Sequence, residues 1–340
     1  GWLASANYLG YLLGALSAMG TRAQPAVAIP TGLIVIGLVT VAMGLGEGFA
    51  FWVVLRALAG IASAWVLIFV SAWCLEKLSH LNRPGLNRVV FAGVGAGMTG
   101  AGALCLALMR LNASSAQAWI VLGILSLGLS LALWPAFGSP CAVRDHRRAE
   151  TRLTRKSIRL VLCYGAFGFG YIIPATFLPV MVKQAIPDLS LFGWVWPIFG
   201  LAAMASTVAT GVLPKSLGNR DLWIGSHLVM ALGVALPVFL PGIPGIMLAA
   251  LFVGGTFMLA TMAAMREAQE VAGRQATRLI AAMTSAFAVG QIAGPISVSY
   301  VAGVDGNFSV ALLIACFFLT ISAFALSRRQ REEKLHETLS

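Results

Sequence analysis

The stretch GSPCAVRDHRRAETRLTRKSIR, residues 138–159, is the longest segment in which polar and charged residues outnumber apolar ones, and it divides the chain in two. Its seven basic residues stand against two acids, Asp145 and Glu150. A short basic segment between membrane spans is retained on the cytoplasmic side, so this linker predicts the orientation of the whole chain. No basic fold with interleaved aromatic residues surrounds it, so we expect no nucleic-acid partner.

The composition is that of an integral membrane protein. Hydrophobic residues make up 59% and charged residues 10% of the 340 residues, and the mean hydropathy is +0.88. A soluble domain carries about 25% charged residues. No Gly-Lys dipeptide occurs, so the phosphate-binding loop of ATPases is absent. We predict neither an enzyme that hydrolyses ATP nor a bound cofactor or metal.

Apolar segments on both sides of the linker are long enough to cross a membrane as helices, which takes about 20 residues. Eleven are expected, at residues 2–20, 26–46, 50–74, 87–109, 117–137, 158–182, 192–213, 221–241, 244–265, 276–302 and 307–327. The sequence therefore predicts an all-α membrane protein. Its parts are an N-terminal bundle at 1–137, the linker at 138–157, a C-terminal bundle at 158–327 and a cytoplasmic tail at 328–340.

The distribution of basic residues supports these spans. Of the 23 Lys and Arg residues, only Arg110 and Lys183 fall on the side opposite the linker, and Arg56 lies inside a span. Basic residues gather on the cytoplasmic side of membrane proteins. We therefore expect a multi-pass protein of the cell's inner (plasma) membrane with its C-terminus in the cytoplasm.

The two halves of the chain are related by a weak internal repeat. Gly1-Trp2-Leu3-Ala4-Ser5 is echoed by Gly193-Trp194-Val195-Trp196-Pro197, and each opens a span rich in small residues. On this register the span at 2–20 is the second helix of its half, and the span that starts at Ile158 is a first helix. We therefore expect one more helix ahead of Gly1, which would complete twelve.

The most informative span is the third, at Arg56-Ala57-Leu58-Ala59-Gly60-Ile61-Ala62-Ser63-Ala64. At i, i+4 and i+8, Arg56, Gly60 and Ala64 share one helical face, so a cation projects beside a groove where another backbone can approach closely. An arginine inside the membrane costs about 2.5 to 3.5 kcal/mol and is expected to face a wet cavity or a partner. The alternative is that Arg56 extends to the lipid headgroups.

This R-x-x-x-G-x-x-x-A pattern resembles the fourth-helix motif of the major facilitator superfamily, whose members are two six-helix bundles joined by a cytoplasmic loop. GWLASANYLGYLLGAL (1–16), LRALAGIASAWV (55–66) and YGAFGFGYIIPATFLPVM (164–181) resemble the YbfB/YjiJ-like bacterial branch. The resemblance implies a major facilitator fold and a secondary transporter. Gly290 to Pro295 are similar to the G-x-x-x-G-P signature of some exporters. That signature belongs to the fifth helix, whose counterpart here, Gly93 to Gly102, lacks the proline, so the resemblance does not establish an antiporter.

Few polar side chains lie within the spans, and they are the candidate substrate-binding residues. With Arg56 they are Asn7, Tyr8, Tyr11, Tyr164, Tyr171 and Gln291. Gly60, Ala64, Gly290, Gly294 and Pro295 are candidate structural or gating residues. For Asn7 and Gln291 an interhelical hydrogen bond is an equal alternative, because a buried amide must find partners. Trp and Tyr residues nearest the span ends are typical of interfacial anchors, and His227 is interpreted as a structural histidine.

No Asp or Glu lies deep in any predicted span, so the sequence does not support a buried proton-coupling carboxylate. A cavity cation without an acidic partner favours an anionic substrate. The predicted function is therefore secondary active transport of a small, anionic molecule by alternating access. The expected partners are this substrate and membrane lipids, with a proton as the candidate coupling ion.

Two other classes of function were weighed. The first is a non-transporting or inactive truncated bundle, since loss of a first helix removes a cavity wall. The second is an intramembrane enzyme or a channel. No acidic, metal-binding or Ser/His constellation supports an enzyme, and no repeated ring of charges supports a channel.

Overall fold

The computed structural model describes residues 2–21, 23–137, 154–185, 193–214, 216–301 and 308–339, without the side chains of 179, 180, 182–185, 274, 299, 301 and 328–339. Within these ranges every regular element is a helix. The predicted all-α fold class is thereby confirmed. Most of the basic linker and the residues at 186–192, 215 and 302–307 lie outside the described ranges.

Five long helices make up the N-terminal bundle. They are α1 (Trp2–Gly20), α2 (Pro25–Leu45), α3 (Phe49–His80), α4 (Asn87–Arg110) and α5 (Ser115–Phe137), with a short 3-10 turn η1 (Pro84–Leu86) before α4. Pro25 occupies the first position of α2, where the missing N–H is not needed. Gly48, just before α3, has φ +110°, a conformation that favours glycine. Turn residues thus set the ends of helices whose interiors are almost wholly apolar.

Six long helices are described in the C-terminal bundle. They are α6 (Arg155–Ala185), α8 (Val195–Ala209), α9 (Asn219–Phe239), α10 (Ile243–Ala272), α11 (Ala276–Val301) and α12 (Ser309–Leu339), with the 3-10 turns η2 (Thr210–Val212) and η3 (Gly273–Gln275). At the start of α9 the backbone N–H of Gly218 donates to the Asp221 carboxylate over 3.2 Å. The acidic side chain also complements the positive end of the helix dipole.

Ten of the described helices are long and apolar enough to span a membrane. The remaining long helix, α1, coincides with the predicted span at 2–20 but carries Asn7, two tyrosines and several small residues, which lower its hydropathy. The chain is therefore a multi-pass membrane protein. Several helices outrun their predicted spans: α3 continues to His80 and α10 to Ala272, past the apolar core.

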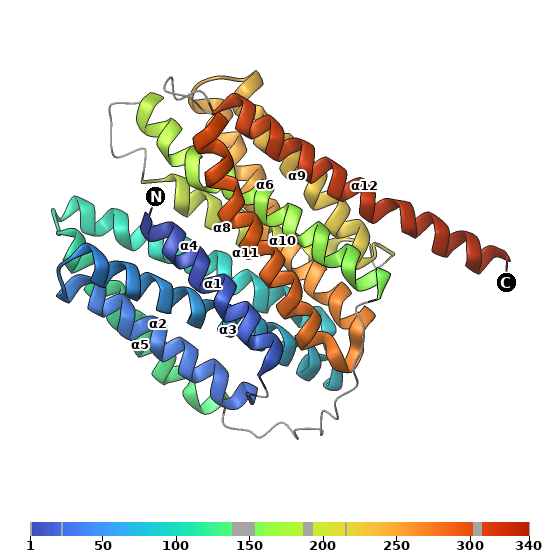
Figure 1. Ribbon diagram of the computed structural model, residues 1–340, viewed down its shortest axis with the longest axis horizontal. Coiled ribbons are helices and arrows are strands. Elements are labelled where there is room, and N and C mark those ends of the chain that lie inside the picture. Colours follow the sequence, from blue (N-terminus) through green and yellow to red (C-terminus); the bar gives the residue numbers. More distant parts are fainter. Residues whose placement is uncertain are drawn as a thin grey trace.

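The two bundles repeat one packing scheme (Figure 1). In the N-terminal bundle α1 packs on α3 and α2 packs on α5, and in the C-terminal bundle α8 packs on α10 and α9 packs on α12. The bundles meet where α1 contacts α11 and where α4 contacts α8. The sequence repeat pairs α1 with α8 and α4 with α11. Replacing each helix by its counterpart turns the α1–α11 contact into the α8–α4 contact, so the two contacts are equivalent. The helix contacts thus support the repeat inferred from the sequence.

Glycines allow the α4–α8 contact to be close. A Cβ at Gly200 would lie 2.6 Å from the backbone nitrogen of Thr99, and one at Gly95 would meet the backbone of Met204. At the α1–α11 contact the Ser285 hydroxyl of α11 lies 3.9 Å from the Met19 sulfur of α1. The bundle interface is therefore packed backbone to backbone on one side.

The bundles differ in how well one helix face is covered. In the C-terminal bundle α6 packs on α11, α12 and α10, and a Cβ at Gly290 of α11 would meet the α6 backbone. The counterpart of α11 in the N-terminal bundle is α4. A Cβ at Gly93, Gly97 or Gly100 would have no neighbour within 4 Å among the described residues. The main hydrophobic core accordingly draws more heavily on the C-terminal bundle.

Candidate functional site

The site begins where α1 and α3 come together. A Cβ at Gly60 would meet the carbonyl oxygen of Asn7, and one at Gly14 would lie 3.0 Å from the Ala64 side chain. Ala64 is fully buried. The face that Arg56, Gly60 and Ala64 share therefore lies against α1, as the spacing of small residues predicts for a close helix contact.

Arg56 lies on this face, partly buried. Its guanidinium carbon is 5.7 Å from the ring centroid of Trp119 on α5, within range of a cation–π interaction. Its backbone carbonyl accepts a hydrogen bond from the Asn7 side-chain amide at 3.0 Å. In the described part of the chain no carboxylate lies within salt-bridge distance of Arg56. Among the residues that the structure describes, the cation therefore contacts an aromatic ring and is not paired with an acid.

Tyrosines of both bundles meet beside Arg56. On α1, Tyr8 lies close to Arg56 and to Thr176 on α6. One turn further along α1, Tyr11 lies close to Tyr164 and Tyr171 of α6 and packs against the hydrophobic core that contains them. The structure thus brings the four predicted site tyrosines together from opposite halves of the chain.

Aromatic rings of the C-terminal bundle hold the two α6 tyrosines in place. Tyr171 stacks on Phe257 of α10, with ring centroids 4.2 Å apart and an interplanar angle of 13°. Tyr164 packs against Phe287 of α11 at 5.2 Å. Such pairs are worth about 0.5 to 1.5 kcal/mol beyond the area they bury. The hydroxyl groups are therefore presented on rigid rings.

The two predicted amides differ in their surroundings. Asn7 makes the interhelical hydrogen bond described above, which is the structural alternative that its sequence position allowed. Gln291 of α11 is partly buried and lies seven residues from Thr284, which places both on one helical face. Among the described residues Gln291 makes no side-chain hydrogen bond with the tyrosines or with Arg56. The structure thus does not join Gln291 to the tyrosine cluster.

The three candidate gating residues of α11 lie where α11 crosses α6. A Cβ at Gly290 would meet the carbonyl oxygen of Gly165 and, at 2.5 Å, the backbone nitrogen of Phe169. One at Gly294 would meet the Ile172 side chain. Pro295 lies inside α11, where a proline removes a backbone hydrogen bond and favours a kink. These residues therefore shape the contact between two helices of the C-terminal bundle.

His227 is fully buried in α9, next to the tyrosine cluster, and Phe167 packs between its ring and those of Tyr164 and Tyr171. Its Nε2 accepts a hydrogen bond from the Trp223 indole at 2.9 Å, and its ring lies 5.5 Å from that of Phe167. Its Nδ1 has no hydrogen-bond partner among the described residues. Aromatic packing and the Trp223 bond fit the structural role predicted for it.

Sequence reasoning missed three residues of the site: Trp119, Thr176 and Phe257. Trp119 lies near the end of its span, where tryptophan is typical of interfacial anchors, so its contact with Arg56 carries no sequence signal. Phe257 is one of 18 phenylalanines in an apolar chain. Thr176 lies within the stretch at 164–181 that resembles the YbfB/YjiJ-like branch, but a single threonine in an apolar span carries no signal of its own.

Comparisons with known proteins agree with this architecture. Residues 1–327 match a family model described as "Uncharacterised MFS-type transporter YbfB", where MFS denotes the major facilitator superfamily. The crystal structure of the human organic anion transporter MFSD10 (TETRAN) is similar in fold, with a TM-score of 0.76 at 16% sequence identity, over 96% of this chain and 83% of that one. Among curated proteins no sequence matches significantly. Because the family model spans nearly the whole chain, the chain belongs to the YbfB-type family of major facilitator superfamily transporters.

Proposed function

We propose that this transporter is a secondary active carrier that moves a small anionic molecule by alternating access. The observation that carries the proposal is that Tyr11 of α1 packs against the core that contains Tyr164 and Tyr171 of α6. A carrier of this kind rocks its two bundles around one site, so that site needs residues from both. The tyrosine cluster meets this requirement, and the α1–α11 and α4–α8 contacts provide the surfaces about which rocking can occur.

The charge of the substrate is argued from Arg56. It is a partly buried cation, held over Trp119 and beside Tyr8. A guanidinium presents a planar set of donors that matches a carboxylate or phosphate. An anionic substrate would supply the negative charge that the described surroundings of Arg56 lack. The structurally similar human protein is described as an organic anion transporter, which agrees with this charge, although that similarity concerns the fold.

The test is uptake by the purified protein in proteoliposomes, with a panel of radiolabelled small carboxylates and phosphates beside neutral sugars. We expect saturable uptake of at least one anion, lost in Arg56→Gln and partly retained in Arg56→Lys. Arg83→Gln removes an exposed cation at the other end of α3 and is the matched control. Transport of a neutral sugar that is unaffected by Arg56→Ala would contradict the proposed substrate class.

Coupling and orientation are part of the same proposal. We propose a proton as the coupling ion, since the fold class uses gradients, and a location in the inner (plasma) membrane with the C-terminus in the cytoplasm. Uptake with an imposed pH gradient should exceed uptake without it and should fall when a protonophore is added. A fluorescent protein fused after Ser340 should fluoresce in cells, and a periplasmic reporter at the same place should be inactive.

A further inference from the structure

The two bundles touch at the end of the molecule where α5 ends and α6 begins, which we call the linker end. The 3-10 turn η2 continues α8 at this end, and α4 begins there with Asn87 and Arg88. A Cβ at Gly211 of η2 would meet Nη1 of Arg88 and would lie 2.6 Å from its Cζ and 3.1 Å from its Nε. The guanidinium of one bundle therefore lies directly on the backbone of the other.

Arg88 meets the negative end of α8. The carbonyl groups at the C-terminal end of a helix carry partial negative charge, which a nearby cation stabilises. In the described part of the chain no carboxylate lies within salt-bridge distance of Arg88, and a second cation, Arg266 of α10, lies close to it. The attraction between Arg88 and the end of α8 therefore joins the two bundles without an ion pair.

The middle of the same helix pair is held in a different way. Gly95 of α4 and Gly200 of α8 bring backbone against backbone, and such a contact changes only if the helices repack. At the linker end the contact is a long side chain on a glycine, which rotation of the side chain can break. The α4–α8 contact thus has a rigid middle and an end that can separate.

Asn87, the neighbour of Arg88, opposes the closed arrangement. Its side chain is 4% exposed, and its Oδ1 has no hydrogen-bond partner among the described residues. A buried polar atom without a partner destabilises the state that buries it. Because α4 packs chiefly on α8 and also on α10, both of the other bundle, separation of the bundles at this end would expose that oxygen to water.

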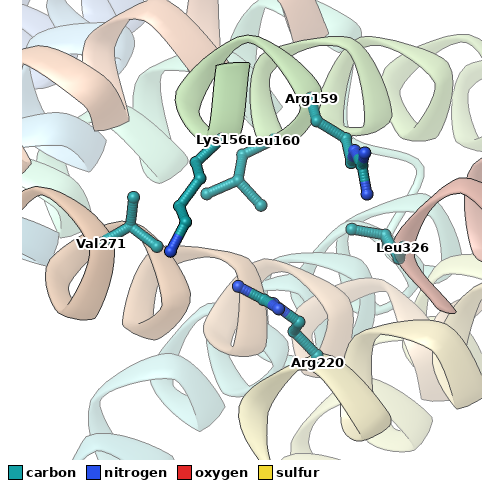
Figure 2. A pocket seen from close by; sticks show the side chains of 6 residues that line it. All are labelled: Lys156, Arg159, Leu160, Arg220, Val271 and Leu326. Carbon is teal, nitrogen blue, oxygen red and sulfur yellow. The ribbon is translucent and has the colours of Figure 1, made fainter. Parts of the chain in front are cut away.

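Other cations at the linker end make bonds within one bundle. Figure 2 shows Lys156, Arg159 and Arg220 around a small pocket of the C-terminal bundle. The Nη1 of Arg159 donates to the carbonyl oxygen of Ala325 over 3.3 Å, and the Nε of Arg220 donates to Glu267 over 2.6 Å. Both bonds join helices of the C-terminal bundle. Arg159, which like Arg88 is partly buried, is therefore a suitable control for it.

We propose that Arg88 is a latch that holds the two bundles together at the linker end, and that Asn87 sets how easily this latch opens. The closed arrangement gains from the contact of Arg88 with η2 and loses from the unpartnered oxygen of Asn87. Substitutions at these two adjacent residues should therefore shift the opening in opposite directions. Opening of this end is a motion that alternating access requires, so in that respect the latch rests on the proposed function.

The experiment is hydrogen–deuterium exchange of the full-length protein in nanodiscs, measured by mass spectrometry. One set of peptides covers η2 and the start of α4 at the linker end, and a second covers the end of α4 and the start of α8 at the far end. The variants are Arg88→Gln, Gly211→Ala and Asn87→Leu, with Arg159→Gln as the control. Gly211→Ala keeps the charge and displaces only Arg88, whose atoms are the three nearest to the new Cβ.

We expect exchange at the linker end to be about two- to fivefold faster in Arg88→Gln and in Gly211→Ala, which is the size of a favourable charge at a helix end. Arg88→Gln/Gly211→Ala should match the single variants, because both remove one contact. Asn87→Leu should slow exchange at least about fivefold, since an apolar side chain leaves no polar atom unpaired. Arg159→Gln should exchange like the wild type.

Unchanged exchange in Arg88→Gln and Gly211→Ala, or faster exchange in Asn87→Leu, would overturn the proposal. Faster exchange at both ends with a lower melting temperature would also count against a latch, because it reports a loss of folding. If the linker end opens while the far end slows, the latch and alternating access are both supported. If the linker end opens and the far end does not change, the latch stands and the proposed alternating access is contradicted.

Discussion

The side-chain amide of Asn7 donates a hydrogen bond to the backbone carbonyl of Arg56 across 3.0 Å, and this bond ties α1 to the helix that carries the intramembrane cation. It fixes the position of Arg56 through its backbone and leaves the guanidinium to contact Trp119. Asn7 therefore holds α1 against α3 beside the candidate site.

Replacement of Asn7 by Leu should lower stability modestly. Interhelical hydrogen bonds in membranes are worth about 0.6 kcal/mol on average and up to about 2 kcal/mol. We expect a melting temperature in detergent lower by a few degrees, and a KM for substrate that rises less than in Arg56→Gln. A large rise in KM with an unchanged melting temperature would instead identify Asn7 as a direct substrate ligand.

Replacement of Gly60 by Ala should be strongly destabilising. The new Cβ would collide with the carbonyl oxygen of Asn7 and lie 2.7 Å from the backbone nitrogen of Tyr11, and a backbone cannot give way as a flexible side chain can. We expect a loss above about 2 kcal/mol, seen as reduced yield of monodisperse protein and a lower melting temperature. The control is Gly225→Ala, where the Cβ meets nothing within 4 Å. Equal stability of the two variants would show that α1 and α3 are further apart.

Removal of the ring beneath Arg56 should weaken substrate binding without removing the charge. Trp119→Leu loses a cation–π interaction worth about 0.5 to 2 kcal/mol, whereas Trp119→Phe retains a weaker one. The guanidinium should then be less well ordered, so KM should rise a few fold in Trp119→Leu and less in Trp119→Phe. If both variants had the KM of the wild type, Arg56 would not depend on the ring for its position.

Arg220 of α9 and Glu267 of α10 form a buried ion pair, with 2.6 Å between Nε and Oε1, and this pair offers a test by double-mutant cycle. Breaking one side of such a pair costs about 3 to 5 kcal/mol, because a charge is left without compensation, whereas replacing both sides by apolar groups is often nearly neutral. Glu267→Leu should therefore destabilise the protein more than Arg220→Met/Glu267→Leu. Thermal melts of the single and double variants give the coupling. Additive losses would show that the pair is not coupled.

The helices could be predicted from the sequence because apolar runs and the one-sided distribution of Lys and Arg mark every crossing. The ends were harder to predict: α3 was expected to stop near residue 74 and runs to His80, because a helix that has left the membrane can carry Glu76 and Lys77 and no longer depends on hydropathy. The repeat likewise gave the helix correspondence that the packing supports.

The site was predictable only in part. The small-residue spacing at Arg56, Gly60 and Ala64 indicates a close helix contact, but it does not say which helix makes it or that Arg56 reaches Trp119 on α5. Those depend on how each helix is rotated about its axis, which an almost uniformly apolar sequence does not specify. The stack of Tyr171 on Phe257 could not be predicted for the same reason. The two residues are far apart in sequence, and their contact depends on how α6 and α10 are rotated toward each other.

Tyr171 allows the ring and the hydroxyl to be separated. Tyr171→Phe retains the stack on Phe257, so the melting temperature should stay within about a degree, whereas the lost hydroxyl should raise KM several fold if it binds the substrate. Tyr171→Ala also removes the ring, which is 7% exposed, and should lower stability by about 3 to 5 kcal/mol. Phe257→Ala is the matched control, because it removes the stacking partner and leaves the hydroxyl. An unchanged KM in Tyr171→Phe would show that Tyr171 supports the packing of α6 and takes no part in binding.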